Sequence, residues 1–135
     1  MSPKIINILL VEDDEVDIMN VKRAFKRNNI NNPLYIARDG EEALTMLRDK
    51  VVPFPKIAII DINMPKMNGI ELLKEIRKDE ELKIISVFVL TTSNVDSDII
   101  EAYNLNVAGY ILKPLSFEKF VEAVSTLNNF WQLCE

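Results

Sequence analysis

The chain has 135 residues, 48% of them hydrophobic and 27% charged, which is the balance expected of one globular domain. Its formal net charge of -5 argues against non-specific binding to nucleic acid, because such binding usually requires a basic face. A single cysteine excludes a disulfide within the chain, and no run resembles a signal peptide or a transmembrane helix, so we expect a cytoplasmic protein without a membrane partner.

Short apolar runs alternate with segments of helical periodicity along the whole sequence. The first run is almost continuously apolar, as expected for a strand that is covered on both faces. The first helical segment places Ile18, Val21 and Phe25 on one face. In chain order, we predict strand 5–11, helix 16–28, strand 34–37, helix 41–48, strand 57–62, helix 68–82, strand 86–91, helix 98–104, strand 109–112 and helix 117–133. This alternation predicts an α/β domain with one parallel sheet covered by helices on both sides.

Polar and charged residues stand at the carboxyl ends of the predicted strands. In an open α/β sheet, ligands bind beyond these ends. The residues in question are Glu12, Asp13 and Asp14 after the first strand, Asp61 and Asn63 at the third, Thr91 at the fourth, and Lys113 and Pro114 at the fifth. We therefore expect several carboxylates, a hydroxyl group and an ammonium group to converge on one edge of the sheet.

Clustered carboxylates repel one another, and a hard divalent cation would relieve that repulsion. Ligand sets made only of oxygen, without histidine or cysteine, suit Mg²⁺. The Asp61 carboxylate beside such a cation could attack phosphorus and become an acyl phosphate. The cation, the Lys113 ammonium group and the Thr91 hydroxyl group would hold the negative charge of the transferred group. The pattern therefore predicts a phosphoryl-accepting site in which no residue has to act as a general base.

Each of these residues also has a purely structural interpretation. Glu12, Asp13 and Asp14 alone are equally well explained as the polar start of a helix. A lysine after a strand commonly extends into solvent, and threonine is an ordinary strand residue. Asp61 is harder to explain in this way, because it interrupts an apolar run and carboxylates are rarely buried without a partner. The placement of all these residues at four strand ends favours the functional interpretation.

Four motifs in order resemble the receiver domains of response regulators, which act in two-component signalling. The motifs are ILLVEDD (8–14), IIDINMPKMNG (59–69), VLTTS (89–93) and AGYILKP (108–114). The resemblance implies a flavodoxin-like, doubly wound sheet of five parallel strands in the order 2-1-3-4-5, with five helices. We expect one receiver domain over residues 1–135 and no output domain.

The resemblance also implies a role for each matching residue. Asp61 would be the phosphoacceptor, and Lys113 would pair with a phosphoryl oxygen. Thr91 and Tyr110 would form a switch that carries the change to the face made by the fourth helix, fifth strand and fifth helix. The Mg²⁺ ligands would be Asp13, Asp61, the main-chain carbonyl of Asn63 and, through water, Glu12. The peptide bond before Pro114 would be cis.

This chain contains no histidine, so a phosphohistidine donor must be another molecule. The resemblance implies that this donor is a sensor histidine kinase or a phosphotransfer protein. Segment 117–131, together with segments 28–32 and 51–56, resembles the stand-alone receivers that partner bacterial phytochrome kinases. An aromatic pair near the end of the chain, Phe130 and Trp131, is explained equally well by core packing and by a dimer or partner surface.

Three other functions are weighed against this one. An aspartate-nucleophile phosphatase would carry an Asp-x-Asp pair on its first strand, whereas here the nucleophile would follow the third strand with Asn63 in second place, so we expect no enzyme. A nucleotide- or flavin-binding domain of similar fold would need a glycine-rich loop, and only three glycines occur. A degenerate, unphosphorylated receiver would lack part of the acidic, threonine and lysine set.

Overall fold

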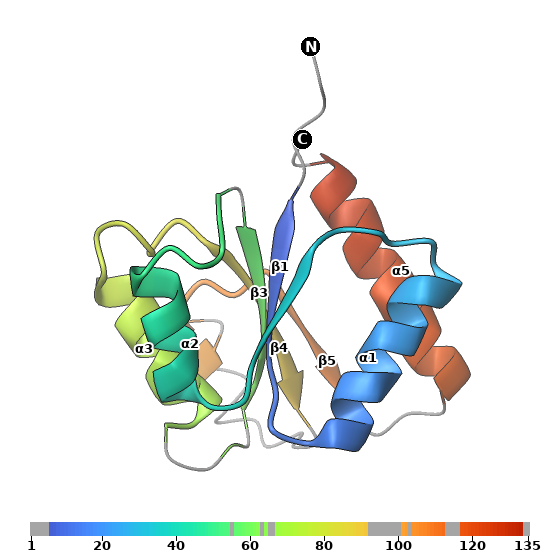
Figure 1. The fold of residues 1–135 in the computed structure, drawn as a ribbon, viewed down its shortest axis with the longest axis horizontal. Helices are drawn as coiled ribbons and strands as arrows, with labels where there is room; N and C mark the ends of the chain where they lie inside the picture. Colours follow the sequence, from blue (N-terminus) through green and yellow to red (C-terminus); the bar gives the residue numbers. More distant parts are fainter. Residues whose placement is uncertain are drawn as a thin grey trace.

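The computed structural model describes residues 6–54, 56–62, 64, 67–91, 101–102, 104–112 and 117–133. Five parallel strands form one sheet in the order β2-β1-β3-β4-β5, and helices lie on both of its faces (Figure 1). The strands are β1 Asn7–Val11, β2 Leu34–Ala37, β3 Lys56–Asp61, β4 Ser86–Thr91 and β5 Gly109–Leu112. The complete helices within the described residues are α1 Glu15–Arg27, α2 Gly40–Arg48, α3 Gly69–Lys78 and α5 Phe117–Leu133. The predicted sheet and its strand order are therefore confirmed.

Side chains of successive strand residues enter two separate cores, one on each face of the sheet. Leu9 and Val11 pack with helices α2 and α3, whereas Ile8 and Leu10 pack with α1 and α5. Figure 1 shows these two helix pairs on opposite sides of the sheet. Strands buried on both faces need an almost continuous apolar sequence, which is the reason that β1 and β3 have no polar alternation.

The register of the central strands decides what lies at the edge of the sheet. Val11 pairs with Ile60, and Asp61 pairs with Leu90. The chain leaves β1 toward β2 on one side and continues with β3 on the other, so the strand order reverses between β1 and β3. This reversal is the place where open α/β sheets bind ligands.

The predicted end of the third helix was wrong. The helix stops at Lys78 instead of continuing to Leu82, and Asp79 has extended backbone angles. The Asp79 carboxylate accepts hydrogen bonds from the N–H groups of Glu81 at 2.9 Å and Leu82 at 3.2 Å, which turns the chain away from the helix axis. The helical spacing of Leu82 was misleading, because this buried residue reaches the core from a turn.

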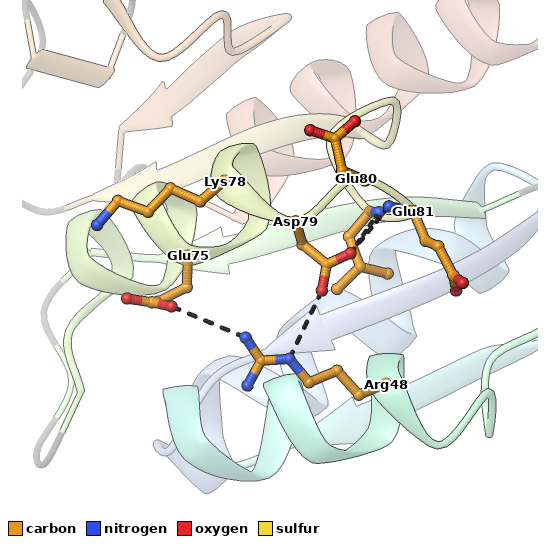
Figure 2. A pocket seen from close by; sticks show the side chains of 7 residues that line it. Arg48, Glu75, Lys78, Asp79, Glu80 and Glu81 are labelled. Carbon is orange, nitrogen blue, oxygen red and sulfur yellow. Dashed lines mark hydrogen bonds and ion pairs between the residues drawn. The ribbon is translucent and has the colours of Figure 1, made fainter.

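Arg48 at the end of α2 holds the end of α3 from outside. Its guanidinium group lies 3.6 Å from the Asp79 carboxylate and 3.8 Å from that of Glu75 (Figure 2).

Of the predicted fourth helix, the structure describes residues 101, 102 and 104, which are helical, and the rest of that prediction lies outside the described residues. None of the helices described is long and apolar enough to span a bilayer.

Candidate functional site

The carboxyl end of β1 separates two kinds of acidic residue. The Glu12 side chain is fully buried and accepts a hydrogen bond from the Asp14 N–H at 3.2 Å, while the Glu12 N–H donates to the Ala37 oxygen at 2.9 Å. The Asp14 carboxylate caps helix α1, accepting from the N–H groups of Val16 and Asp17 at 2.8 and 3.1 Å. The structural interpretation therefore holds for Asp14, which stabilises the helix start as N-cap residues do.

Asp61 is the last residue of β3 and is only 3% exposed. It lies between β1 and β4, and the next residue, Ile62, donates its N–H to the Leu90 oxygen at 3.0 Å. The sheet therefore fixes the backbone on which the Asp61 carboxylate is carried. A carboxylate at this depth loses most of its hydration, which raises the cost of its charge unless something compensates for it.

Glu12, Asp13 and Asp61 come together, and each offers one carboxylate oxygen within 4.8 Å of the others. We call these three residues the acidic trio. Glu12 and Asp61 are buried and Asp13 is exposed, so the trio opens to solvent on the Asp13 side. Two unit charges about 4 Å apart repel by about 4 kcal/mol at an effective dielectric constant of about 20. Three such carboxylates are therefore costly to keep ionised together.

The donor set of the acidic trio fits a hard divalent cation. All of its ligand atoms are carboxylate oxygens, which cations such as Mg²⁺ and Ca²⁺ prefer, and their negative charge would be neutralised by the ion. Because Glu12 is buried and Asp13 is exposed, one side of the acidic trio stays open to water or to a substrate oxygen. The acidic trio can thus hold a metal ion at the carboxyl edge of the sheet.

The remaining predicted site residues are only partly described. Thr91 is the last residue of β4, one position after the Leu90 that pairs with Asp61, although its side chain lies outside the description. Tyr110 lies in β5, pairs with Val89 and is 40% exposed. Asn63, Lys113 and Pro114 lie outside the described residues, as do the side chains of Phe130 and Trp131.

Two glycines that lie tightly against other segments were not predicted from the sequence to matter for the site. Gly69 lies against the main chain of Asp61 and Ile62, and Gly40 lies against Met67. Gly40 directly precedes the predicted helix 41–48, and Gly69 lies in the first turn of the predicted helix 68–82, so neither position indicated a role in the site. Nothing in one sequence tells a glycine that needs space from a glycine that needs an unusual backbone angle.

Comparison with known proteins identifies the family. The family model "Response regulator receiver domain" matches residues 8–125. The chain is 39% identical over 127 residues to the "Probable methanogenesis regulatory protein FilR2" of Methanothrix harundinacea, covering 92% of this chain and 82% of that protein. It is 37% identical over 133 residues to "Response regulator Rcp1" of Synechocystis, covering 96% of this chain and 89% of the relative.

Solved structures show the same likeness in three dimensions. The phosphorylated cyanobacterial phytochrome response regulator RcpA superposes with a TM-score of 0.84 at 33% identity, over 96% of this chain and 95% of that one. The Mn²⁺-bound form of Rcp1 superposes with a TM-score of 0.83 at 37% identity, over 96% and 94% of the two chains. With the parallel sheet and the acidic trio at its carboxyl edge, these matches show that the chain belongs to the response regulator receiver domains of two-component signalling.

Proposed function

We propose that Asp61 accepts a phosphoryl group from a partner histidine kinase or phosphotransfer protein, with Mg²⁺ in the acidic trio, and that this changes a protein-binding surface. The observation that carries the proposal is the position of Asp61. It is a buried carboxylate at the end of a central strand, and it shares an opening to solvent with two other acids.

Asp61 would act as the nucleophile in this step. One of its oxygens forms a bond to phosphorus while the bond from phosphorus to the donor nitrogen breaks, and that nitrogen then takes a proton from water. The attacking group is a carboxylate oxygen rather than a hydroxyl group, so no general base is required to activate it. A divalent cation supplies charge neutralisation for the phosphoryl oxygens. Asp13 and Asp61 would hold that cation directly and Glu12 through water, as the resemblance to receiver domains implies, and their carboxylate oxygens lie close enough together to do so.

Further residues complete the proposed site. The main-chain carbonyl of Asn63 would be a further ligand of the ion. Lys113 pairs with a phosphoryl oxygen, and the Thr91 hydroxyl group donates a hydrogen bond to the same phosphoryl group. Tyr110 then turns inward, with Pro114 in a cis peptide bond beyond it. The 40% exposure of Tyr110 supports the switch, since a half-exposed aromatic ring has somewhere to move.

We propose that Mg²⁺ is the physiological ion and that the protein is located in the cytoplasm. Magnesium takes oxygen ligands almost exclusively, and the acidic trio offers only oxygens. The Mn²⁺-bound structure of the relative Rcp1 supports a divalent site, since manganese shares this preference for oxygen. A chain without histidine must receive its phosphoryl group from another molecule, and the likeness to Rcp1 and RcpA supports a phytochrome-type kinase as that partner.

The face that contains β5 and α5 is the proposed protein-binding surface, and a second copy of the chain is one candidate partner for it. In this proposal the receiver domain acts as a switch rather than as an enzyme. Light scattering with and without beryllofluoride, which mimics the acyl phosphate, should show a change in assembly if the partner is a second copy. Turnover of a phosphate ester by the purified protein would favour a phosphatase instead.

The test of the phosphorylation site compares matched aspartate variants. Acetyl phosphate with Mg²⁺ should add one phosphoryl group to the parent protein, measured by intact-protein mass spectrometry. Asp61→Asn should abolish this addition, and Asp13→Asn should slow it by at least about tenfold. Asp14→Asn is the control, because asparagine is an equally good N-cap and Asp14 lies outside the acidic trio. Labelling that persists in Asp61→Asn would refute the assignment.

A further inference from the structure

Only three glycines occur in the chain, and two of them lie where a side chain does not fit. A methyl group added at Gly69 would lie 2.7 Å from the Ile62 Cα and closer still to the main-chain oxygen of Asp61. A methyl group added at Gly40 would lie 2.7 Å from the main-chain oxygen of Met67. These distances are well below van der Waals contact, so the neighbouring main chain would have to move.

Gly69 closes the connection between β3 and α3. It is the first residue of α3, it is buried, and its N–H donates to the Ile62 oxygen at 3.0 Å. Ile62 is itself bonded to Leu90 of β4 through its N–H. The start of α3 therefore rests directly on the end of β3, at the residue that follows Asp61.

Gly40 contacts the same connection through Met67. It is the first residue of α2, it is buried, and it contacts Met67, which stands two positions before Gly69. An alanine at position 40 would meet the oxygen, Cβ and Cγ of Met67 between 2.7 and 2.8 Å. The Cγ atom can rotate away, whereas the main-chain oxygen cannot, so the whole residue must shift.

A displacement of the Asp61 main chain would change the acidic trio. Its three carboxylate oxygens lie within 4.8 Å of one another, and Glu12 and Asp13 are held by a different strand end. Magnesium requires near-ideal octahedral geometry at about 2.0–2.1 Å, whereas calcium accepts irregular geometry at about 2.3–2.6 Å. Movement by a few tenths of an ångström would therefore weaken magnesium binding more than calcium binding.

We propose that Gly69, supported by Gly40, is a positioning residue that holds the Asp61 carboxylate in the place that a small divalent cation requires. The missing side chain at position 69 lets α3 approach β3 closely enough to fix Asp61 opposite Glu12 and Asp13. This inference rests on the metal site proposed above and concerns its selectivity for the small ion.

The experiment measures Mg²⁺ and Ca²⁺ binding by isothermal titration calorimetry. The proteins are the parent, Gly69→Ala, Gly40→Ala and, as the matched control, Gly109→Ala, whose added methyl group would meet only the Phe88 ring at an ordinary 3.7 Å. Gly69→Ala should weaken Mg²⁺ binding at least about tenfold and Ca²⁺ binding several-fold less. Gly40→Ala should change the ratio of the two affinities in the same direction by a smaller factor, and Gly109→Ala should leave both affinities unchanged.

The outcomes separate this inference from the function on which it rests. If the parent protein binds neither ion, the metal site itself is refuted. If the parent and Gly109→Ala bind Mg²⁺, and a folded Gly69→Ala binds it with the same affinity and the same preference over Ca²⁺, the metal site stands and the positioning role is overturned.

A second measurement requires no substitution and covers the case in which Gly69→Ala does not fold. The proposal couples two events, the packing of Gly69 against the end of β3 and the binding of the metal ion. Because such coupling is reciprocal, saturating Mg²⁺ must slow hydrogen exchange of the Gly69 N–H in the parent protein. The internal reference is the Ala108 N–H, which donates to the Val87 oxygen at 2.7 Å. This hydrogen bond lies far from the acidic trio in the fold. Equal exchange at Gly69 with and without Mg²⁺ would overturn the proposal.

Discussion

Arg77 joins the end of α3 to two later segments of the chain, residues 83–85 and 105–106. Its guanidinium group donates to the main-chain oxygens of Leu105, Lys83, Ile85 and Asn106 at distances of 2.7, 2.7, 2.8 and 3.0 Å. Burial lowers the pKa of Arg77 from its ordinary value, yet the group stays charged at neutral pH. The side chain thus ties the end of α3 to the segments that lead into β4 and β5.

We predict that Arg77→Met lowers the free energy of unfolding by about 3 kcal/mol. Four carbonyl oxygens, those of Leu105 and Ile85 in part-buried hydrogen bonds, would lose a charged donor, and methionine fills a similar volume without replacing it. Urea denaturation without divalent ions is the measurement. Arg27→Met, which removes the exposed ion pair with Glu118, is the control and should cost less than about 1 kcal/mol. A loss at position 77 no larger than at position 27 would contradict this account.

At the scale of the elements, helix α3 is delimited by side-chain caps at both ends. At its start, Asn68 and Glu71 form a reciprocal capping box. At its end, the Asp79 carboxylate bonds to the next turn. The pKa of Asp79 is lowered, first by the hydrogen bond from the Glu81 N–H and further by that from Leu82 and by Arg48.

We predict that Asp79→Ala destabilises the protein at neutral pH and that this deficit shrinks in acid. A carboxyl group with a lowered pKa in the folded state stabilises the fold fully above its unfolded pKa of about 3.9, and this contribution is lost as pH falls through the folded pKa. Urea midpoints of the parent and the variant, measured from neutral pH into acid, should therefore converge below about pH 4.

Glu81→Ala is the matched control for this series, because the substitution keeps the main-chain donor while it removes a neighbouring carboxylate. Its difference from the parent should be small across the same range. A deficit of Asp79→Ala that stays constant with pH would mean that the charge of Asp79 contributes nothing.

At the scale of the whole molecule, repulsion within the acidic trio lowers the stability of the folded state. The chain already carries a net charge of -5, and three of its carboxylates converge at one edge of the sheet. Packing of the two cores must outweigh this repulsion when no cation is bound. Stability and metal binding are consequently linked.

We predict that Mg²⁺ stabilises the parent protein by about 2.7 kcal/mol at a free concentration about 100 times the dissociation constant, which corresponds to a rise in Tm on the order of 5–10 °C. Differential scanning calorimetry in EDTA and in Mg²⁺ measures this shift. The shift should follow the logarithm of the Mg²⁺ concentration, since only the folded state assembles the three ligands.

We predict the opposite pattern for Asp13→Asn. Removing one of three like charges should raise stability in EDTA by on the order of 1 kcal/mol and should abolish most of the Mg²⁺-dependent rise. Asp14→Asn, with its cap retained, should behave like the parent protein in both solutions. A variant at position 13 that melts below the parent in EDTA would show that the acids of the trio do not repel one another in the folded protein.

Local chemistry made most of the elements predictable. The strands 34–37, 86–91 and 109–112 and the last helix were predicted with the bounds that the structure has, because apolar runs and helical spacing are local signals. The end of α3 was not, because a competing side-chain hydrogen bond at Asp79 interrupts a spacing that continues beyond it. Helix ends depend on single capping interactions, which spacing does not report.

The sequence by itself determined the alternation of elements, the two apolar faces of the central strands and the polar residues at the strand ends, since each follows from the order of neighbouring residues. Only the tertiary structure decided which of the three acids join Asp61: Glu12 and Asp13 do, and Asp14 is left to cap α1. It also showed that positions 40 and 69 have no room for a side chain, because Met67 and the end of β3 lie against them. The acidic trio and the Gly40–Met67 contact join residues that are far apart in the sequence, whereas the Gly69 contact joins the end of one strand to the start of the next helix. The contacts between distant residues exist only after parallel strands have been placed side by side.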